Sequence, residues 1–507
     1  MVSNVYMDRD YNSITKSIVE TGFFSEYLPP CFKLEPEVFS KFPPENCDLI
    51  PPYCFTMSRY NGNDARRNIY IPEISAYVVL CNYLINNDII KELIEFTETD
   101  ESSFSPILGK NSSIMRHEQS YIDNKEDISS DYIENIVKKI IRSAGAKKIL
   151  KLDISNCFSS FYMHMIPAIF LGLDKAEEEY KKILNKSNPQ AKNEFYEKYQ
   201  KLDKLLRQQN LNRTNGLLSG PIISKIIVEG ILARIDKELS SESIKFSRYV
   251  DDYEVYLYDD NYKTIISIFT RILKRYGFVL NNEKTEVISF PYYVAENLEK
   301  IFKKYKKEEM DNSDLMEMFN VYFLLEKNGV KGAIRYLIKT LEKDPITAPD
   351  FHLYKAYLLS ILENDERSLS KVCSLFIENR RNLTLDDRDV KNIERMIEKH
   401  IDYEHDLEVI WLLFLLIETS SIRQDNGIIL KIINSKNELA HIVLLRNDLL
   451  NKDKIDLLKK SASSWILLYE LYASQHLEEE ELKSKLNIKK NIKMYQYLKQ
   501  NNIHFCN

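Results

Sequence analysis

Hydrophobic and polar positions in the first third of the chain predict a short strand followed by a helix. In residues 66–95, RRNIYIPEISAYVVLCNYLINNDIIKELIE, an apolar stretch ends at Pro72 and apolar residues then recur at the spacing of a buried helix. Just upstream, seven of the 15 prolines fall between Pro29 and Pro52. Because proline cannot donate a backbone hydrogen bond, we expect this segment to be extended and loop-rich and to wrap around another part of the molecule.

The middle of the chain continues with strand and helix patterns in turn. KKILKLDISNCF, residues 147–158, indicates a strand, and residues 177–209 indicate a charged helical hairpin broken near Pro189. GLLSGPIISKIIVEGILARIDKEL, residues 216–239, predicts a loop and then an amphipathic helix. Helices that alternate with strands in this way favour an α/β layer with a small sheet.

Residues 246–258, FSRYVDDYEVYLY, predict a tight β-hairpin with Asp251 and Asp252 at or beside its turn. A further helix is expected up to Tyr276. GFVLNNEKTEVISF, residues 277–290, then predicts a strand, a turn and a second strand. The hairpin therefore presents two neighbouring carboxylates between runs of strand-forming residues.

The C-terminal region is predicted to be entirely helical. After Pro349 the chain has no proline and a single glycine, Gly427. Apolar clusters such as YKAYLLSIL, LEVIWLLFLLIE and SSWILLYELYA recur at irregular intervals, as stacked helical hairpins would produce. No repeat is regular enough to choose between an irregular α-solenoid and a bundle.

Length, composition and charge limit the possible classes of protein. A chain of 507 residues predicts two or three domains, and its 44% hydrophobic and 29% charged residues are ordinary for a globular protein. No apolar run is long enough for a membrane span, and MVSNVYMDRDYNS lacks the regions of a signal peptide, so we expect a cytoplasmic protein. A net charge of −6 gives no global basic surface, so any nucleic acid must bind in a local groove.

The cysteines argue against both a disulfide framework and a zinc site. They are odd in number, scattered and never at C-x-x-C spacing, which favours buried thiols at Cys31, Cys47, Cys54, Cys81, Cys157, Cys373 and Cys506.

Asp251 and Asp252 are the first candidates for chemistry. Neighbouring carboxylates repel, and a site that holds them together usually holds a divalent cation as well. By itself an Asp-Asp pair is more typical of a solvated turn, because aspartate is a favoured turn former.

Other stretches change this interpretation when they are taken together. Upstream, a strand ends in Asp153, and Phe158 follows five residues later. Between the carboxylates, NGLLSGPIIS supplies Gly216 and Gly220, which allow backbone to approach a ligand closely. Downstream, LNNEKT places Lys284 in a turn. Each stretch alone has an ordinary structural explanation, but their order and spacing favour a common site.

This set of motifs resembles the palm of reverse transcriptases and related polymerases. Asp153 matches the first catalytic aspartate of that palm, and YVDD, with Asp251 and Asp252, matches its Y-x-D-D hairpin. GLLSG resembles the G-L-P-Q-G loop, and LNNEKT resembles the following motif with its lysine. RRNIYIP resembles the fingers motif R-P-L-G-I-P, which places Arg67 five residues before Pro72.

The resemblance implies a metal-dependent nucleotidyl transfer. Two Mg²⁺ ions, for which Mn²⁺ can substitute, would be held by Asp153 and Asp251, with Asp252 nearby and the carbonyl of Ile154 as a further ligand. Such ions neutralise charge on a triphosphate and support in-line attack on its α-phosphorus.

The resemblance also implies residues that bind the deoxynucleotide. Arg67 would hold the β- and γ-phosphates in a bidentate grip. Phe158 would lie beneath the sugar and clash with a 2′-hydroxyl, and Gly220 belongs to the same nucleotide-binding set. Lys284 would protonate the departing pyrophosphate as a general acid.

The chain departs from templated enzymes in two places. Leu218 and Ser219 replace the Pro and Gln of the loop that contacts the template base and primer. After residues 290–313 the chain continues into the long helical region instead of a compact basic thumb.

Within the superfamily, the chain resembles the abortive-infection reverse transcriptases of bacterial phage defence. The resemblance rests on ARRNIYIPEISAYVVLCNYLINN, LDISNCFSSFYMHMIPAIFLG and FSRYVDDYEVYLY, together with the layout that lacks a thumb. It implies DNA synthesis without a template, a protein tyrosine as primer, and single-stranded DNA product that stays covalently attached. It also implies a homo-oligomer, a trimer or a hexamer, and HEAT-type helical repeats at the C-terminus.

The expected fold is therefore an α/β (α+β) palm and fingers of reverse-transcriptase type, followed by an all-α repeat domain, with no conventional thumb. The resemblance covers roughly residues 20–295. We expect an N-terminal segment and fingers in residues 1–146, a palm in 147–300 with a helical insertion at 174–210, and helical repeats in 301–507.

Two alternatives to template-independent synthesis stay open. A templated RNA-directed DNA polymerase, as in retron-type elements, would share Asp153, Asp251 and Asp252 and would differ in requiring RNA. The chain could also be a non-catalytic palm that supports an interaction scaffold, although aspartates at all three positions argue against an inactive palm. The chain has 32 tyrosines, and the priming residue stays unassigned, with Tyr6 and Tyr11 as conceivable positions.

Overall fold

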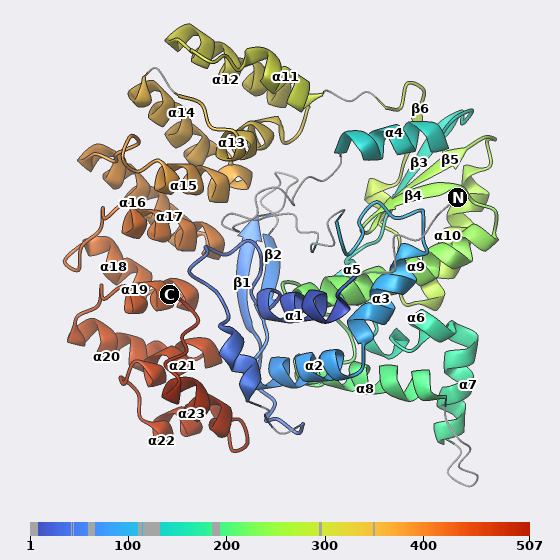
Figure 1. Cartoon of the computed structure of the whole chain (residues 1–507), viewed down its shortest axis with the longest axis horizontal. Coiled ribbons are helices and arrows are strands. Elements are labelled where there is room, and N and C mark those ends of the chain that lie inside the picture. Colours follow the sequence, from blue (N-terminus) through green and yellow to red (C-terminus); the bar gives the residue numbers. More distant parts are fainter. Residues whose placement is uncertain are drawn as a thin grey trace.

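The computed structural model of the chain consists of a mixed α/β part and a column of helices that lie side by side (Figure 1). The structure describes residues 9–41, 43, 45–58, 66–109, 114, 132–184, 193–293, 297–347 and 350–507. The hairpin of β1 (Tyr53–Ser58) and β2 (Arg66–Ile71) lies between the two parts.

The strand predicted before Pro72 is β2, which pairs with β1 in an antiparallel ladder. The single helix predicted after it is in fact two helices, α2 (Ile74–Asn86) and α3 (Ile89–Glu98). They are separated at Asp88, which has a left-handed backbone (φ 51°) that a continuous helix does not allow. Both helices are largely buried, as expected.

The proline-rich segment wraps against the helical column, as predicted. It follows α1 (Tyr11–Thr21) and forms the 3₁₀ helix η2 (Pro36–Ser40). The carboxylate of Asp48 accepts hydrogen bonds from the backbone N–H groups of Lys489, Lys490 and Asn491 at the start of the last helix of the column. Asn507 donates its backbone N–H to the carbonyl of Cys31 (3.0 Å).

A four-stranded antiparallel sheet forms the centre of the α/β part, with strand order β4-β5-β3-β6. The strands are β3 (Lys148–Asp153), β4 (Phe246–Tyr249), β5 (Asp252–Leu257) and β6 (Glu286–Ser289). On its inner face, Tyr253 packs its ring against Phe246 and Phe269, with centroids 5.6 and 5.3 Å away. Phe269 belongs to α10 (Tyr262–Arg275), so this helix covers the predicted hairpin.

Two local predictions in this region were wrong. The helix expected to be amphipathic, α9 (Ile222–Ser241), is buried on most of its surface, because it packs against α1, α3 and α10 at once. The strand expected at residues 277–280 is reduced to one bridge between Leu280 and Ile154, and the 3₁₀ helix η5 (Asn282–Lys284) follows it before β6.

The remaining helices of the α/β part include a pair that lies away from the sheet, α7 (Leu173–Leu184) and α8 (Glu194–Gln208) (Figure 1). This pair is the predicted charged hairpin, and its break near Pro189 lies outside the described residues. The other elements are short or peripheral: α4 (Tyr132–Arg142), α5 (Cys157–Ser160), η4 (Met163–Met165) and α6 (Ala168–Leu171).

The C-terminal part is helical, as predicted, and its helices follow one another down one side of the molecule (Figure 1). They are α11 (Leu298–Tyr305), α12 (Asn312–Lys327), α13 (Ala333–Lys343), α14 (Phe351–Asn364), η6 (Glu366–Ser368), α15 (Leu369–Glu378), α16 (Asp387–Asp402), α17 (Asp406–Glu418), α18 (Gly427–Ile433), α19 (Glu438–Arg446), α20 (Lys452–Ser461), α21 (Trp465–Ala473), α22 (Glu479–Leu486) and α23 (Ile492–Gln500).

These helices form a stack with an inner row. In this row α13, α15, α17, α19, α21 and α23 each contact the next member, and α14, α16, α18 and α22 pack against it from outside. The apolar segments of α17 and α21 are buried almost completely, which accounts for the apolar clusters in the sequence. The assignment to HEAT-type repeats stays a prediction, as do the domain boundaries.

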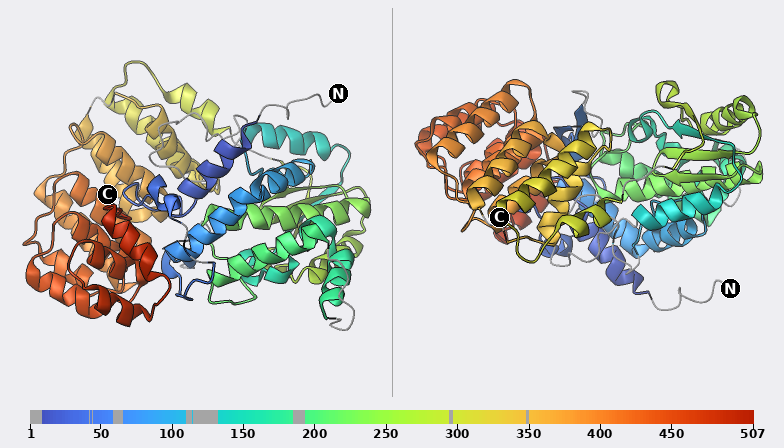
Figure 2. Two further views of the ribbon diagram at one scale, coloured as in Figure 1. Left: turned by 60° about the horizontal axis from the view of Figure 1, so that its bottom comes forward. Right: turned by 90° about the horizontal axis from the view of Figure 1, so that it is seen from above.

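The column, defined here as residues 298–507, is attached to the β1–β2 hairpin and the N-terminal segment, which lie against it in all three views (Figures 1 and 2). Thr56 on β1 donates its backbone N–H to Asp406 (2.8 Å), and Arg66 on β2 forms two hydrogen bonds with the buried carboxylate of Glu408. Trp411 donates its indole N–H to the carbonyl of Tyr27 (2.7 Å).

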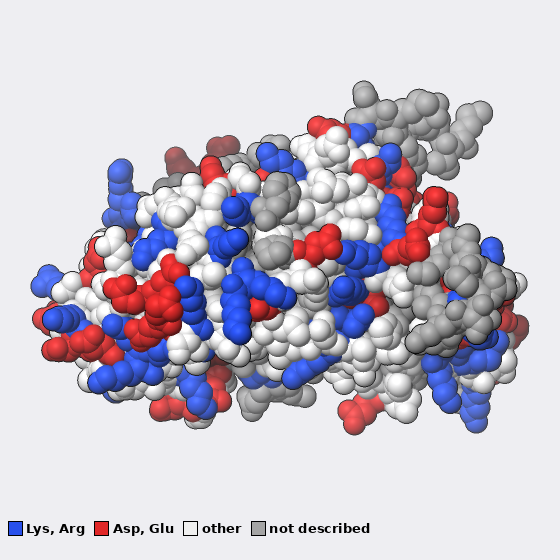
Figure 3. Space-filling model, turned by 90° about the horizontal axis from the view of Figure 1, so that it is seen from below, with Lys and Arg blue, Asp and Glu red and all other residues white. Residues whose placement is uncertain are grey.

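The surface carries charges of both signs. On the face seen from below, lysine and arginine side chains are interspersed with aspartate and glutamate (Figure 3), in keeping with the small net charge of −6. The cysteines are buried, as predicted, except Cys54, which faces outward from β1. Among the described residues no helix has both the length and the apolar character that a membrane span requires.

Candidate active site

Three carboxylates meet where β3 ends and β5 begins. Asp153 is the last residue of β3, and the register of the ladder places it opposite Asp252, the first residue of β5. Asp251 lies in the turn before β5, and one oxygen from each of the three side chains lies within 4.8 Å of the others. The structure therefore brings the three predicted catalytic aspartates together.

The backbone around the turn holds this arrangement. Val250 adopts a left-handed conformation (φ 54°), which is unfavourable for a β-branched residue and needs support from its surroundings. The carbonyl of Asp251 accepts the backbone N–H of Ile154 at 3.1 Å, so the turn is tied directly to the end of β3. Ile154, the predicted backbone ligand, is thus part of the same unit.

The carboxylates change one another's protonation. Burial raises the pKa of Asp251, the negative charge of Asp153 adds to this rise, and the positive charges of Arg67 and Lys284 oppose it. Loss of solvent raises the pKa of Asp252 to about 7, and its hydrogen bond with Asp153 and the charge of Asp251 add to that rise. Three crowded carboxylates thus resist full ionisation until a cation compensates their charge.

The donor set fits a hard divalent cation. Carboxylate oxygens are the ligands that such ions prefer, and three of them from separate side chains lie close enough to share an ion. Asp153 is 6% exposed, so the site combines a buried anchor with more accessible partners.

Basic and amide groups border the acidic cluster. Lys284 in η5 places its Nζ 2.7 Å from Asp153 Oδ1, and Asn281 donates its amide to Asp153 Oδ2 at 3.1 Å. Arg67 lies exposed on β2 and is close enough to lower the pKa of Asp251. Of the predicted nucleotide-binding residues, Lys284 and Arg67 therefore act directly on the carboxylates.

The predicted glycine loop contains Gly220 and contacts Phe158, the other two residues predicted to bind the nucleotide. Leu217 donates its backbone N–H to the carbonyl of Phe158 (2.9 Å). Tyr70 on β2 donates its backbone N–H to the carbonyl of Ser219 (2.7 Å). Gly220 has a φ of 133°, and a Cβ atom there would lie 2.6 Å from the carbonyl oxygen of Tyr70. The loop thus joins Phe158 to β2 through a close approach that only glycine permits. The roles of Phe158 and Gly220 in nucleotide binding stay predictions.

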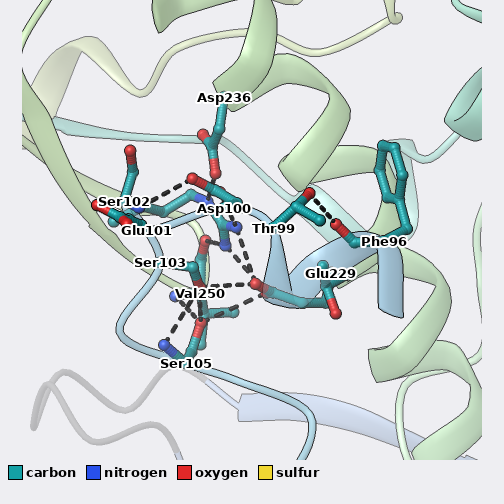
Figure 4. A network of polar contacts seen from close by, with 12 residues as sticks. Phe96, Thr99, Asp100, Glu101, Ser102, Ser103, Ser105, Glu229, Asp236 and Val250 are labelled. Carbon is teal, nitrogen blue, oxygen red and sulfur yellow. Dashed lines mark hydrogen bonds and ion pairs between the residues drawn. The ribbon is translucent and has the colours of Figure 1, made fainter. Parts of the chain in front are cut away.

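A buried arginine that the sequence did not predict holds the turn, and its partners Glu229, Asp236 and Val250 are labelled in Figure 4. Arg248 on β4 is fully buried and donates hydrogen bonds to Glu229 (2.8 and 2.9 Å) and Asp236 (2.6 Å) on α9. Its guanidinium also donates to the carbonyl of Val250 (2.9 Å).

The segment after α3 completes this network from the opposite side. Ser105 accepts the backbone N–H of Val250 (2.9 Å), and Ser103 donates to Glu229 (2.7 Å). The backbone N–H of Arg248 donates to the carbonyl of Ser102 (2.8 Å), and the backbone N–H of Phe104 donates to the carbonyl of Arg248 (2.7 Å). Both backbone polar groups of Val250 are therefore held, which fixes the strained residue that precedes Asp251.

The sequence contains a signal for this network. Arg248 shares the inward-facing side of β4 with Phe246, and an arginine at a core position requires buried acidic partners. Glu229 and Asp236 are seven residues apart in an apolar helix, and this spacing places both on one face.

Comparison with known protein families finds a match that includes most of the predicted polymerase motifs. The family model described as reverse transcriptase (RNA-dependent DNA polymerase) matches residues 80–337, just over half of the chain. The matched segment contains all three aspartates and Lys284. None of the curated proteins compared with the chain matches it significantly.

Several solved structures are similar to the chain. Telomerase from Candida albicans in complex with a TWJ fragment of telomeric RNA shares 13% identity over 82% of this chain and 66% of that chain, with a TM-score of 0.31. Apo telomerase from Candida tropicalis shares 12% over 79% and 69%, with a TM-score of 0.33. Telomerase from Candida tropicalis with the TWJ fragment shares 11% over 82% and 64%, with a TM-score of 0.29. The chain thus spans about two thirds of the length of these telomerase chains.

Replacement of Arg248 by lysine is expected to lower the free energy of unfolding by about 3 kcal/mol, because one ammonium cannot reach Glu229, Asp236 and the Val250 carbonyl together. Denaturation by urea measures the change. The matched control is Arg271→Lys, which alters an exposed ion pair with Glu242 and should cost less than about 0.5 kcal/mol. Equal stability of the two variants would contradict the role assigned to Arg248.

Replacement of Gly220 by alanine is expected to lower the unfolding free energy by about 2 kcal/mol or more, since the new Cβ meets the Tyr70 carbonyl and the φ of 133° is strained for alanine. Thermal unfolding followed by circular dichroism detects the loss. Gly427→Ala serves as the control, because open space surrounds that position. A Gly220→Ala protein as stable as the control would show that the loop can move away from β2.

Proposed function

The chain belongs to the reverse-transcriptase family, and on this premise we propose that it is a DNA polymerase that joins deoxynucleotides without a template. We propose further that a tyrosine hydroxyl of the protein is the primer and that the activity serves bacterial abortive-infection defence against phage. The observation that carries polymerase chemistry is the cluster of Asp153, Asp251 and Asp252, whose oxygens lie within 4.8 Å of one another beside Lys284.

The same cluster would hold the metal ions of the reaction. Asp153 and Asp251, with Asp252 and the carbonyl of Ile154, would bind two Mg²⁺ ions, for which Mn²⁺ can substitute. When bound, such ions neutralise triphosphate charge and lower the pKa of the attacking hydroxyl. The protein's part is to hold the carboxylates in place, which the register of β3 with β5 and the support of Val250 accomplish.

The bordering residues would bind and orient the deoxynucleotide. Arg67, exposed on β2, would bind phosphates with two parallel hydrogen bonds. Lys284 would give a proton to the departing pyrophosphate, and it lies beside Asp153 at 2.7 Å. Phe158 would exclude a 2′-hydroxyl from the sugar site.

Two features support synthesis without a template. Leu217 and Leu218 are each only 4% exposed, so the loop that contacts template and primer in related enzymes directs its leucines into the core here. Ser219, which replaces the glutamine of that loop, uses its carbonyl to bind β2. In addition, the chain after the palm forms a column attached to the β1–β2 hairpin, where templated enzymes have a thumb.

A protein primer accounts for an enzyme without these template contacts. A tyrosine hydroxyl can replace a 3′-hydroxyl as the attacking group, and single-stranded DNA product would then stay attached to the chain. Tyr11 begins α1 and is partly buried, and Tyr6 lies outside the described residues, so the priming tyrosine stays unassigned. We propose a homo-oligomer, a trimer or a hexamer, as the working form.

A templated RNA-directed DNA polymerase is the second candidate function. The description of the matching family, RNA-dependent DNA polymerase, favours it. The two functions share the carboxylates and differ in whether an RNA template must be added.

The first test uses nuclease-treated full-length protein with Mg²⁺ and each labelled deoxynucleotide, without template or primer, analysed on a denaturing gel. Label that migrates with the protein is expected from the wild type. Because the carboxylates hold the metal ions, Asp251→Asn should reduce this signal by about 10³-fold or more.

The other outcomes identify the competing functions. Labelling only after a primed RNA is added would replace the proposal with a templated polymerase. No labelling under either condition would favour a non-catalytic scaffold. If Asp251→Asn labels as strongly as the wild type, the signal comes from a contaminating enzyme.

Replacement of Phe158 by alanine is expected to raise incorporation of ribonucleotides relative to deoxynucleotides by about tenfold, because it removes the group that would exclude the 2′-hydroxyl. Competition between labelled ATP and dATP measures the ratio. Phe195→Ala, at an exposed position on α8, is the matched control and should leave the ratio unchanged. An unchanged ratio in Phe158→Ala would assign sugar discrimination to another residue.

A further inference from the structure

A second cluster of metal-binding side chains lies in the helical column, close to its contact with β2. Glu366 begins η6, His400 lies in the last turn of α16, and His405 precedes α17. One donor atom from each of the three lies within 4.8 Å of the others. No cysteine takes part, so the C-x-x-C spacings considered in the sequence could not predict this cluster.

The two imidazoles are held together by a rigid turn. His405 donates its backbone N–H to the carbonyl of His400 (2.8 Å), and Glu404 between them adopts a left-handed conformation (φ 54°). This is the Schellman arrangement that ends many helices. It places the Nδ1 atoms of His400 and His405 3.0 Å apart, and Glu366 Oε1 lies 3.8 Å from Nδ1 of His405.

These distances suit a small tetrahedral ion. Zinc binds imidazole nitrogen at about 2.0–2.1 Å, which places two ligands of one ion about 3.3 Å apart. Two nitrogens and one carboxylate favour zinc over magnesium, whereas the all-oxygen cluster of the palm favours magnesium. The two clusters thus differ in the chemistry of their donors.

The cluster combines a buried donor with an accessible one. His400 is only 7% exposed. Arg66 lies 3.4 Å from Glu366, but its guanidinium also forms two hydrogen bonds with Glu408, which balances its charge. The side chain of Glu366 is 40% exposed, so solvent can reach the cluster.

We propose that Glu366, His400 and His405 form a zinc site that joins η6, α16 and α17, with a water molecule as the fourth ligand. The ion fixes the surface of the column on which Arg66 rests. Arg66 is adjacent to Arg67, so the zinc site supports the strand that carries the phosphate-binding arginine. The proposed role of the ion does not depend on the polymerase activity.

Metal analysis of the full-length protein, purified without a histidine tag, tests this proposal. After dialysis against chelator-free buffer, inductively coupled plasma mass spectrometry should find about one zinc ion per chain. His400→Gln and His405→Gln should each reduce this content by about tenfold or more, because each removes a ligand.

Two control variants distinguish zinc bound at this cluster from zinc bound elsewhere on the protein. His352→Gln, at an exposed position on α14, should keep the zinc content of the wild type. Asp251→Asn should also keep it, because that residue lies in the palm. Zinc that is lost in Asp251→Asn and kept in both histidine variants would overturn the proposal.

A second measurement needs no variant. Removal of zinc from the wild type with a chelator should lower the Tm by about 3 °C, and added zinc, but not magnesium, should restore it. If the purified protein holds no zinc and added zinc leaves the Tm unchanged, the two histidines share a proton in a hydrogen bond and the proposal is wrong.

Discussion

Repulsion among three carboxylates is the constraint on which the rest of the structure depends. Asp153, Asp251 and Asp252 place oxygens within 4.8 Å of one another, and in water such groups would move apart. The fold prevents this with backbone pairing and with side chains that support the turn. Asp153 and Asp252 are paired in the ladder of β3 and β5, and the carbonyl of Asp251 is bound to the end of β3. The buried guanidinium of Arg248 then holds the turn itself.

The support of the site extends outward in successive contacts. The Val250 turn rests on α9 and on residues 102–105, and the glycine loop joins the Phe158 segment to β2. Strand β2 in turn is attached to the helical column through Arg66 and Glu408. Arg67 is therefore flanked by a residue anchored to the column. Strand β2 is thus held by the column through Arg66 and by the glycine loop through Tyr70.

The sequence predicted the parts of the site that depend on local pattern. Local pattern predicted a strand that ends at Asp153 and a hairpin turn at Asp251 and Asp252. The order of the motifs and their resemblance to a reverse-transcriptase palm made the three aspartates candidates for one site. Arg248 was missed because its partners come from positions 100–105, 229 and 236, which only the folded chain brings together.

The same dependence on distant partners explains the wrong prediction for α9. An apolar helix with a few charges has an amphipathic pattern in sequence, but Glu229 and Asp236 are buried against Arg248. The predicted helix 73–95 was divided because a single left-handed residue, Asp88, leaves little trace in apolar periodicity.

The two-row stack of the column has a consequence for the order of folding. Its helices contact mainly their neighbours along the chain, so each contact closes a short loop and carries a small entropic cost. The central sheet is different, because residues 148–153 must wait for residues 252–257 and 286–289 before β3 has a partner on either side. Helix pairs of the column are therefore expected to assemble faster than the sheet. The surface that receives β1 and β2 would then exist before the acidic cluster closes.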